Sequence, residues 1–341
     1  MRKRIGIVIT LVVAGLALAI VTGWSALVLF YLALGPSWMR SVLAWSFVAL
    51  GLVALGAFAV RRARWPVAIG FAVAVALVLV VWGSARPSND RDWPPEVAVL
   101  PHATIDGERV TVHNIRNFDY RTETEFTPAY YDRTFDLRRL DRVDLVAAYW
   151  MGPAIAHLFL TFGFGDEHLA ISIEVRKERT KPYGTLPGFF RQYELVYIVA
   201  DERDVIRVRT NYRQSPPEEV YLFRLIGPIE HGRRIFLDYM RDINALRERP
   251  RFYNTLTTNC TTMILAHAAM NPGSIPYSWK VLLSGYAPEY AYDRGRLDRS
   301  LPFEEVKRRA HINAVAQAAD QAPDFSQRIR AGLPTLPPAS R

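Results

Sequence analysis

The chain of 341 residues contains a single cysteine, Cys260, within the segment YNTLTTNCTTMILAHAAM. Thr257, Thr258 and Asn259 precede it, and each is a good helix N-cap. An apolar, helix-forming run follows, so the pattern predicts Cys260 in the first turn of a helix. Unpaired backbone N–H groups and the helix dipole there favour an anion, which lowers the pKa of a thiol and can stabilise an oxyanion. The alternative is that Cys260 is a small buried apolar residue.

A thiolate nucleophile usually needs an imidazole partner, and the chain has seven histidines. His157 opens the apolar run AHLFLTFGF, where a polar side chain is costly to bury unless it is satisfied. His267 lies two turns along the cysteine helix, about 10 Å down the axis, too far for a hydrogen bond. We therefore favour His157 as the base, with a purely structural histidine as the alternative. Four other histidines lie in segments with no special pattern: His102, His113, His231 and His311.

A third member follows from hairpin geometry. The runs IAHLFLTFGF and HLAISIEVRKE flank Gly165-Asp166-Glu167, which is a hairpin signature. With the turn centred near Asp166-Glu167, paired positions sum to about 333, and Glu174 becomes a diagonal neighbour of His157 on the same face. Glu174 could then orient the ring as the acid of a triad does.

Two other readings bear on this assignment. His168 would lie at the turn, roughly 25 Å from the level of His157, and is rejected as the orienting group. Glu174 could instead form a surface salt bridge with Arg176 or Lys177. A register slip of one residue would void the assignment of Glu174, because side chains alternate between faces.

No cofactor or metal ion is expected. The sequence contains no Walker loop, no G-x-G-x-x-G and no H-E-x-x-H, and one cysteine cannot form a C-x-x-C pair. The histidines show no metal-ligand spacing. A lone thiol also cannot form an internal disulfide, so in an oxidising compartment it is a candidate reactive group.

The elements that position these residues follow a sharp split in composition. Three apolar blocks cover about 5–34, 42–60 and 66–82, and each can cross ~30 Å of hydrocarbon as a helix. Buried core helices are disfavoured because they would normally show a polar face. Arginines and lysine before the first block, and arginines at 61–64, predict a cytoplasmic N-terminus and an extracytoplasmic remainder. We expect a multi-pass protein of the bacterial inner membrane with a periplasmic domain.

The formal net charge of +9 does not indicate a nucleic-acid partner. Much of the excess lies in the arginine clusters beside the apolar blocks, where topology explains it. The other arginines alternate with acids, as in DERDVIRVRTNYR. Attraction to anionic lipid head groups explains the residual charge better.

The predicted organisation has four parts. Residues 1–83 form three transmembrane helices, 84–101 a linker with a reach of at most ~60 Å, 102–300 the thiol-enzyme domain, and 301–341 a C-terminal helix followed by a loose tail from about Gly332. The fold class is α+β, with an antiparallel sheet. The predicted strands are ERVTVHNIRNF, LDRVDLVAAYW (strand or short helix), the His157 hairpin, YELVYIVA, VIRVRTNYR and EEVYLFRL (strand or helix), and the predicted helices are GRRIFLDYMRDINALRER, the cysteine helix and PFEEVKRRAHINAVAQAADQA.

The stretches NFDYRTETEFTPAYYDRTFDL, YWMGPAIAHLFLTFGF, ISIEVRKE, YELVYIVADERDVIRVRTNYR and FYNTLTTNCTTMI together resemble the Lnb-type periplasmic domain over roughly residues 114–290. That family is similar to circularly permuted relatives of NlpC-type, papain-like thiol hydrolases, in which the histidine strand precedes the cysteine helix. Lecithin:retinol acyltransferase has a similar permuted arrangement. The resemblance implies that Cys260 is the nucleophile and His157 the base, whereas Glu174 rests on the hairpin geometry.

The named member of this family is a lipoprotein N-acyltransferase, which moves an acyl chain from the glyceryl group of a lipoprotein's N-terminal cysteine to its amino group. The resemblance implies a membrane-anchored cysteine acyltransferase acting on a lipid ester or lipidated peptide through a thioester. Two alternatives are an NlpC-like thiol peptidase that cuts cell-wall peptides and a non-enzymatic membrane scaffold in which Cys260 only packs.

Overall fold

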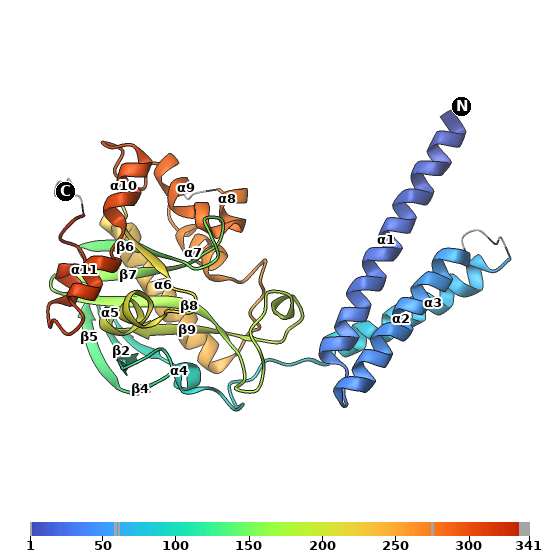
Figure 1. Cartoon of the computed structure of the whole chain (residues 1–341), viewed down its shortest axis with the longest axis horizontal. Coiled ribbons are helices and arrows are strands. Elements are labelled where there is room, and N and C mark those ends of the chain that lie inside the picture. Colours follow the sequence, from blue (N-terminus) through green and yellow to red (C-terminus); the bar gives the residue numbers. More distant parts are fainter. Residues whose placement is uncertain (1, 58–59, 61, 274–275, 334–341) are drawn as a thin grey trace. The chain divides into compact units, whose positions relative to one another are not determined.

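The computed structural model describes residues 2–57, 60, 62–273 and 276–333, and it divides into two compact units (Figure 1). Unit 1 comprises residues 1–88 and 182–193, and unit 2 comprises 89–181 and 194–341. The second unit is therefore interrupted by a segment that packs with the first.

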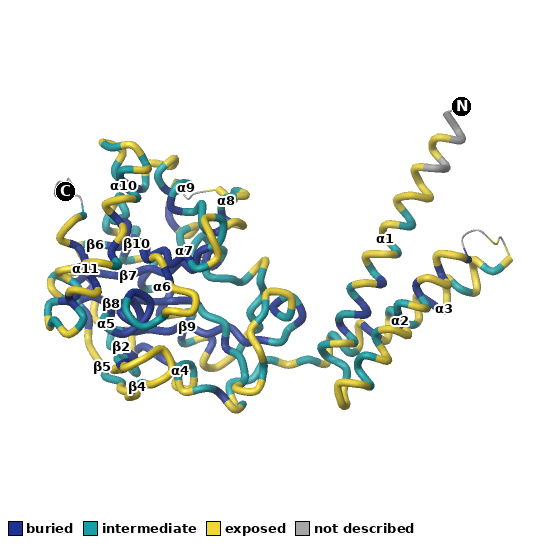
Figure 2. Tube along the Cα trace, viewed as in Figure 1, coloured by how far each residue is buried: buried dark blue, intermediate teal, exposed yellow. Residues whose placement is uncertain are grey.

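Unit 1 is built on three apolar helices, which confirms the three predicted N-terminal helices. They are long and apolar enough to cross a membrane, over Ile9–Leu32, Ser37–Ala57 and Arg64–Ser84. Most of their surface is exposed although it is apolar (Figure 2), a pattern that suits lipid and not water. The helices are α1 (Arg2–Leu32), α2 (Ser37–Ala57) and α3 (Arg64–Ser84).

Residues 182–193 complete unit 1 by packing against these helices. The Phe190 ring stacks on Tyr31 with centroids 5.4 Å apart, and it meets Trp82 edge-on at 6.5 Å. The guanidinium of Arg191 donates a hydrogen bond of 2.7 Å to the carbonyl oxygen of Trp82. This segment joins two strands of the domain, so the domain is tied to unit 1 at a second place, which the sequence did not reveal.

Unit 2 is an α+β domain around a mixed sheet in the order β1-β2-β9-β8-β7-β6-β10, with β5 also paired to β2. The prediction of antiparallel pairing holds for every strand pair described in this sheet except β2 and β9, which run parallel at Arg116 and Ala200. A separate two-stranded sheet pairs β3 with β4. The strands are β1 (His102–Asp106), β2 (Arg109–Arg116), β3 (Asp119–Tyr120), β4 (Phe126–Thr127), β5 (Tyr130–Asp136), β6 (Arg142–Tyr149), β7 (Ala156–Phe164), β8 (Glu167–Arg176), β9 (Glu194–Ala200) and β10 (Glu219–Arg224).

Both faces of the sheet are covered, because alternate residues of the central strands enter two separate cores. Leu158, Leu160 and Phe162 of β7 pack with the long helix α6. Phe159 lies on the other face, with Ile206 and Ala316. The helices and helical turns of the domain are α4 (Pro95–Ala98), η1 (Leu137–Arg139), η2 (Pro187–Phe189, in the unit 1 segment), α5 (Glu202–Val205), η3 (Val208–Tyr212), α6 (Ile229–Glu248), α7 (Cys260–Ala268), α8 (Trp279–Leu282), η4 (Ser284–Tyr286), α9 (Ala287–Asp293), α10 (Phe303–Ala310), α11 (Asn313–Ala318) and α12 (Phe325–Arg328).

One predicted strand is wrong. The run VIRVRTNYR alternates like a strand, but it forms the end of α5 and the π-helical turn η3. Residues 204–210 are all buried, so burial does not alternate here, and two of these residues are held by buried ion pairs. Asp204 pairs with Arg116 at 2.6 Å, and Arg209 pairs with Glu218 at 3.0 Å.

The predicted C-terminal helix is broken into α10 and α11 at His311, which bridges to Tyr221 of β10. The chain stays fixed beyond α12, because Arg330 is buried in ion pairs with Asp144 and Glu202. Most of the tail predicted to be loose, from Pro334 onward, lies outside the described residues.

The tether between the units is shorter than the predicted linker 84–101. Asn89 is already bound to the domain: its amide donates to the carbonyl oxygen of Leu246 at 3.1 Å and its carbonyl accepts from Arg176 at 2.9 Å. Residues 85–88 therefore connect the end of α3 to Asn89.

Candidate active site

Cys260 is the first residue of α7, as the sequence predicts, and it is half-buried. Asn259 is the N-cap. Its side chain accepts from the backbone N–H of Thr262, and the Thr262 hydroxyl accepts from the backbone N–H of Asn259, which completes a capping box. The box fixes the first turn, so the sulfur is held at the positive end of the helix dipole.

His157 and Glu174 face each other across the β7–β8 hairpin. The turn is Gly165-Asp166, and Phe159 pairs with Ser172, so paired positions sum to 331 (159 + 172) and not to about 333. The register thus differs from the prediction by two residues. Because side chains alternate with period two, the face is unchanged, and Glu174 lies directly opposite His157 instead of diagonally.

The imidazole of His157 is bound at one nitrogen by two groups of β8. Its Nε2 lies 2.7 Å from the hydroxyl of Ser172 and 3.0 Å from Oε1 of Glu174. The Ser172 hydroxyl also donates to Glu174 at 2.8 Å. These contacts leave Nδ1 as the ring nitrogen available to the thiol. Ser172 is fully buried, and the sequence analysis did not select it.

The His157 side chain and the backbone N–H of Leu158 lie close enough to the sulfur of Cys260 to lower its pKa, and the Thr261 hydroxyl lies 3.7 Å from it. The β7–β8 ladder ends at Phe159, whereas β8 continues to pair with β9 as far as Arg176. The start of β7 is therefore free of β8, which makes the Leu158 N–H available to the sulfur.

Arg209 completes the constellation, and the sequence analysis missed it because its segment was predicted as a strand. Its side chain is 5% exposed, and it pairs with Glu174 at 3.0 Å and with Glu218 at 3.0 Å. The alternative partner Arg176 bonds instead to Asn89 and to the carbonyl oxygens of Val97 and Ala98. Glu174 is thus held between His157 and a buried guanidinium.

These charges set the protonation states. Burial lowers the pKa of His157, but Glu174 and Cys260 together outweigh it and raise that pKa to about 9. Burial raises the pKa of Glu174, but the charge of and hydrogen bond to His157, with Arg209, hold it well below its usual value. Burial also raises the pKa of Cys260, but the charge of His157 and hydrogen bonding to the sulfur together give a net lowering. The directions favour a thiolate–imidazolium pair beside an ionised carboxylate.

The segment after α7 locks the start of the histidine strand. The Ser284 hydroxyl accepts from the backbone N–H of Ala156 at 3.0 Å, and Gly285 N–H donates to Ala154 at 3.0 Å. Tyr149 donates its hydroxyl to the carbonyl oxygen of Gly285 at 2.7 Å. A Cβ at Gly285 would lie 2.0 Å from the carbonyl oxygen of Pro153, so only glycine fits.

The rejected histidines have other partners. His267 is buried between Asp238, 2.5 Å from Nδ1, and the hydroxyl of Tyr197, 2.7 Å from Nε2. His168 pairs with Gly163 near the turn, and its Nδ1 contacts the carbonyl oxygen of Asp166. Neither contacts Cys260 or His157 in the bonds described.

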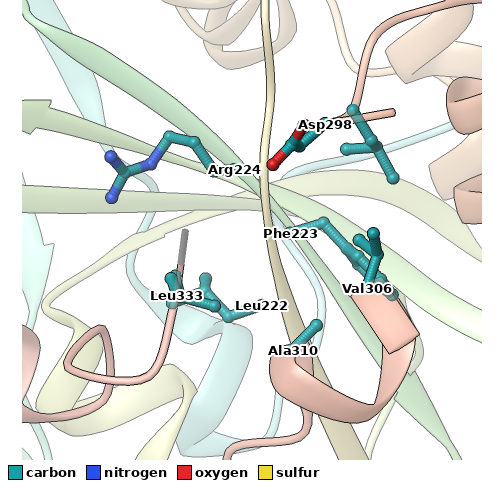
Figure 3. A pocket seen from close by; sticks show the side chains of 8 residues that line it. Leu222, Phe223, Arg224, Asp298, Val306, Ala310 and Leu333 are labelled. Carbon is teal, nitrogen blue, oxygen red and sulfur yellow. The ribbon is translucent and has the colours of Figure 1, made fainter. Parts of the chain in front are cut away.

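No cluster of metal-ligating side chains occurs among the residues that the structure describes. A small pocket shown in Figure 3 lies at β10 and contains none of the three predicted site residues. Its lining is Leu222, Phe223, Arg224, Leu297, Asp298, Val306, Ala310 and Leu333.

Comparison with known proteins gives one match. No curated protein and no solved structure matches the chain. A family model, the Lnb N-terminal periplasmic domain, matches residues 126–285, which run from β4 to η4 and include His157, Glu174 and Cys260. Three helices able to cross a membrane precede this match. Residues 126–285 are therefore similar to the Lnb N-terminal periplasmic domain, and the same chain has three helices long and apolar enough to cross a membrane.

Proposed function

We propose that this protein is a membrane-anchored cysteine acyltransferase that moves an acyl chain from a lipid ester to an amine through a thioester on Cys260. The observation that supports it most directly is the cluster of Cys260, His157 and Glu174, with opposite charges favoured on the sulfur and the ring. Glu174 is the orienting acid. The membrane helices and the family match support a lipid substrate met at the bilayer of the inner membrane, with the domain in the periplasm.

The first half-reaction forms the thioester. The Cys260 thiolate attacks the ester carbonyl, and the helix N-terminus together with the Leu158 N–H provides donors near the developing oxyanion. The tetrahedral intermediate breaks its C–O bond, and the His157 imidazolium gives its proton to the departing alkoxide. The acyl group is then on sulfur, and the imidazole is neutral.

The second half-reaction transfers the acyl group. An amine attacks the thioester carbonyl while neutral His157 takes a proton from the attacking nitrogen. The C–S bond breaks, which restores the thiolate beside the imidazolium and leaves an amide product. Glu174 and Ser172 keep Nε2 bonded throughout, so the ring stays oriented with Nδ1 toward the sulfur.

The test uses the full chain in detergent micelles, offered a diacylated lipopeptide or muropeptides, with products identified by mass spectrometry. The proposal predicts conversion of the lipopeptide to its N-acyl lyso form by the native chain, and none by Cys260→Ala or His157→Gln. His231→Gln is the control for a histidine outside the site. Cleavage of muropeptides alone would favour the thiol peptidase, and turnover of neither substrate would favour a scaffold.

A further inference from the structure

The segment between α7 and α9 is nearly free of charge. Residues 270–288 read MNPGSIPYSWKVLLSGYAP and contain one ionisable group that is charged at neutral pH, Lys280. Its ammonium is 2.8 Å from Asp293 and 3.2 Å from Glu289. The segment therefore offers almost no uncompensated charge to water, although 22% of the whole chain is charged.

Large apolar side chains of this segment point outward. Tyr277 is 60% exposed and Trp279 58% exposed, and Leu282 and Leu283 are 44% and 37% exposed. We call these four residues the α8 patch. The Trp279 ring contacts Tyr286 with centroids 5.4 Å apart. Adjacent exposed aromatic and leucine side chains indicate an interaction surface.

The α8 patch borders the candidate active site. α8 packs beside α7, whose first residue is Cys260. The patch continues directly into Ser284 and Gly285, which bind the strand start next to His157. Two more exposed apolar residues flank the same place: Leu256, four residues before Cys260, and Met151, six before His157.

A lipid bilayer is the partner that best fits the α8 patch, because three helices of the same chain are long and apolar enough to cross one. The stretch from Ser84 to Asn89 has five Cα–Cα steps, which span at most about 18 Å. The connection therefore limits how far Asn89 can lie from the end of α3, the third helix that is long and apolar enough to cross a membrane. Trp and Tyr are enriched at membrane–water interfaces, and leucines add apolar area that inserts below the head groups.

We propose that the α8 patch inserts into the interfacial region of this bilayer and brings the mouth of the Cys260 site to the lipid. Insertion itself does not depend on catalysis. Its consequence, that a lipid ester reaches the sulfur without leaving the membrane, rests on the proposed function.

The single native cysteine allows a direct test on the full chain. In a Cys260→Ala background, Trp279→Cys and Leu282→Cys are labelled with a nitroxide and reconstituted into vesicles of phosphatidylethanolamine and phosphatidylglycerol. Val315→Cys is the matched control, because Val315 is also an exposed apolar helix residue, at 41%, but lies on α11. Electron paramagnetic resonance power saturation then compares access of oxygen, which concentrates in lipid, with access of a water-soluble nickel chelate.

The proposal predicts high oxygen and low nickel access at positions 279 and 282, and the reverse at 315. High nickel access at 279 and 282 would overturn it. Protection of these positions from both reagents would also overturn it, in favour of a protein partner. Lipid-like access at all three would mean that insertion is not specific to the patch, which contradicts the proposal as well. Because Cys260 is absent, none of these outcomes depends on the acyltransferase activity.

Discussion

At the residue scale, the site holds a chain of alternating charge. The sulfur, the imidazole, Glu174 and Arg209 follow one another, and Glu218 ends the series. Burial opposes every one of these charges, and each is stabilised by its neighbour of opposite sign. Arg209 has two effects: it keeps Glu174 ionised, and it opposes protonation of His157. The net direction for the pKa of His157 is nevertheless upward, because Glu174 and Cys260 both raise it.

Reaction of the only thiol with iodoacetamide reports the ion pair. Because the imidazolium lowers the pKa of Cys260, alkylation of the native chain is expected to reach its half-maximal rate at a lower pH than an ordinary thiol. His157→Gln is expected to move this midpoint upward, with His231→Gln unchanged. An unchanged midpoint in His157→Gln would show that the ring does not act on the sulfur.

Acyl transfer should also decline above about pH 9, where His157 loses the proton that it gives to the leaving alkoxide.

Glu174→Gln removes the charge that raises the pKa of His157 but keeps a side chain of similar shape. Burial and Arg209 then lower the pKa of the ring, so the imidazolium is lost at lower pH. We expect acyl transfer to fall by on the order of 10²–10⁴ and its alkaline limit to shift to lower pH. The pH–rate profile measures both. A purely structural Glu174 would leave the limit at the native pH.

The sequence predicted the relation of His157 to Glu174 even though its register was off by two residues. Side chains alternate between the two faces of a sheet, so a register error of two residues leaves each side chain on the predicted face. Ser172 lies on the same face of β8 as Glu174, but nothing in the local sequence indicates that this serine contacts His157. Arg209 could not be found because its partners, Glu174 and Glu218, lie 35 and 9 residues away along the chain, and no local pattern encodes such pairing.

At the element scale, three elements meet at the sulfur. α7 carries it. The start of β7, which pairs with β6 but not with β8, provides the ring and the Leu158 N–H, and η4 fixes that start through Ser284 and Gly285. The sequence predicted α7 from its N-cap residues and the helical run after them. It predicted β7 from its apolar, strand-like pattern, and both signals are local. The role of η4 could not be predicted, because it arises from close approach to a strand about 130 residues earlier.

Gly285→Ala tests this support. The new Cβ would lie 2.0 Å from the Pro153 carbonyl oxygen, a backbone atom that can move only with the start of β7. We expect a loss of about 1–3 kcal/mol in stability, the usual cost of overpacking, and slower alkylation of Cys260 at neutral pH as His157 shifts. Thermal unfolding and the alkylation assay measure these effects. Gly227→Ala, whose nearest contact would be an ordinary 3.5 Å, is the control, and equal behaviour of the two variants would contradict this account.

At the scale of the whole molecule, the chain after the matched family region closes the domain. Arg330 lies on the face of the sheet opposite α6. It forms ion pairs with Asp144 and Glu202, which are both fully buried. Composition predicted the two-part architecture, since lipid-spanning helices have a distinctive apolar length. It did not predict the closing role of the C-terminal segment, nor the return of residues 182–193 to unit 1, because both depend on contacts made after folding.

Arg330→Met should destabilise the domain strongly. It leaves the Glu202 carboxylate buried without its guanidinium, and breaking a buried pair in this way costs about 3–5 kcal/mol. Arg328→Met removes an exposed pair with Asp324 on the same helix and should cost less than about 1 kcal/mol. Thermal unfolding of the full chain in detergent gives the comparison, and equal losses would show that the network does not close the fold.

The central claim is that Cys260 carries the acyl group, and intact-protein mass spectrometry after incubation with a diacylated lipopeptide tests it most directly. With the acceptor amine blocked, the account predicts a mass increase of one acyl chain on the native protein, located on Cys260 and removed by neutral hydroxylamine, as a thioester is. Cys260→Ala should show no such adduct. An acyl chain at any other residue, or an unmodified Cys260 while the lipopeptide is consumed, would contradict the account.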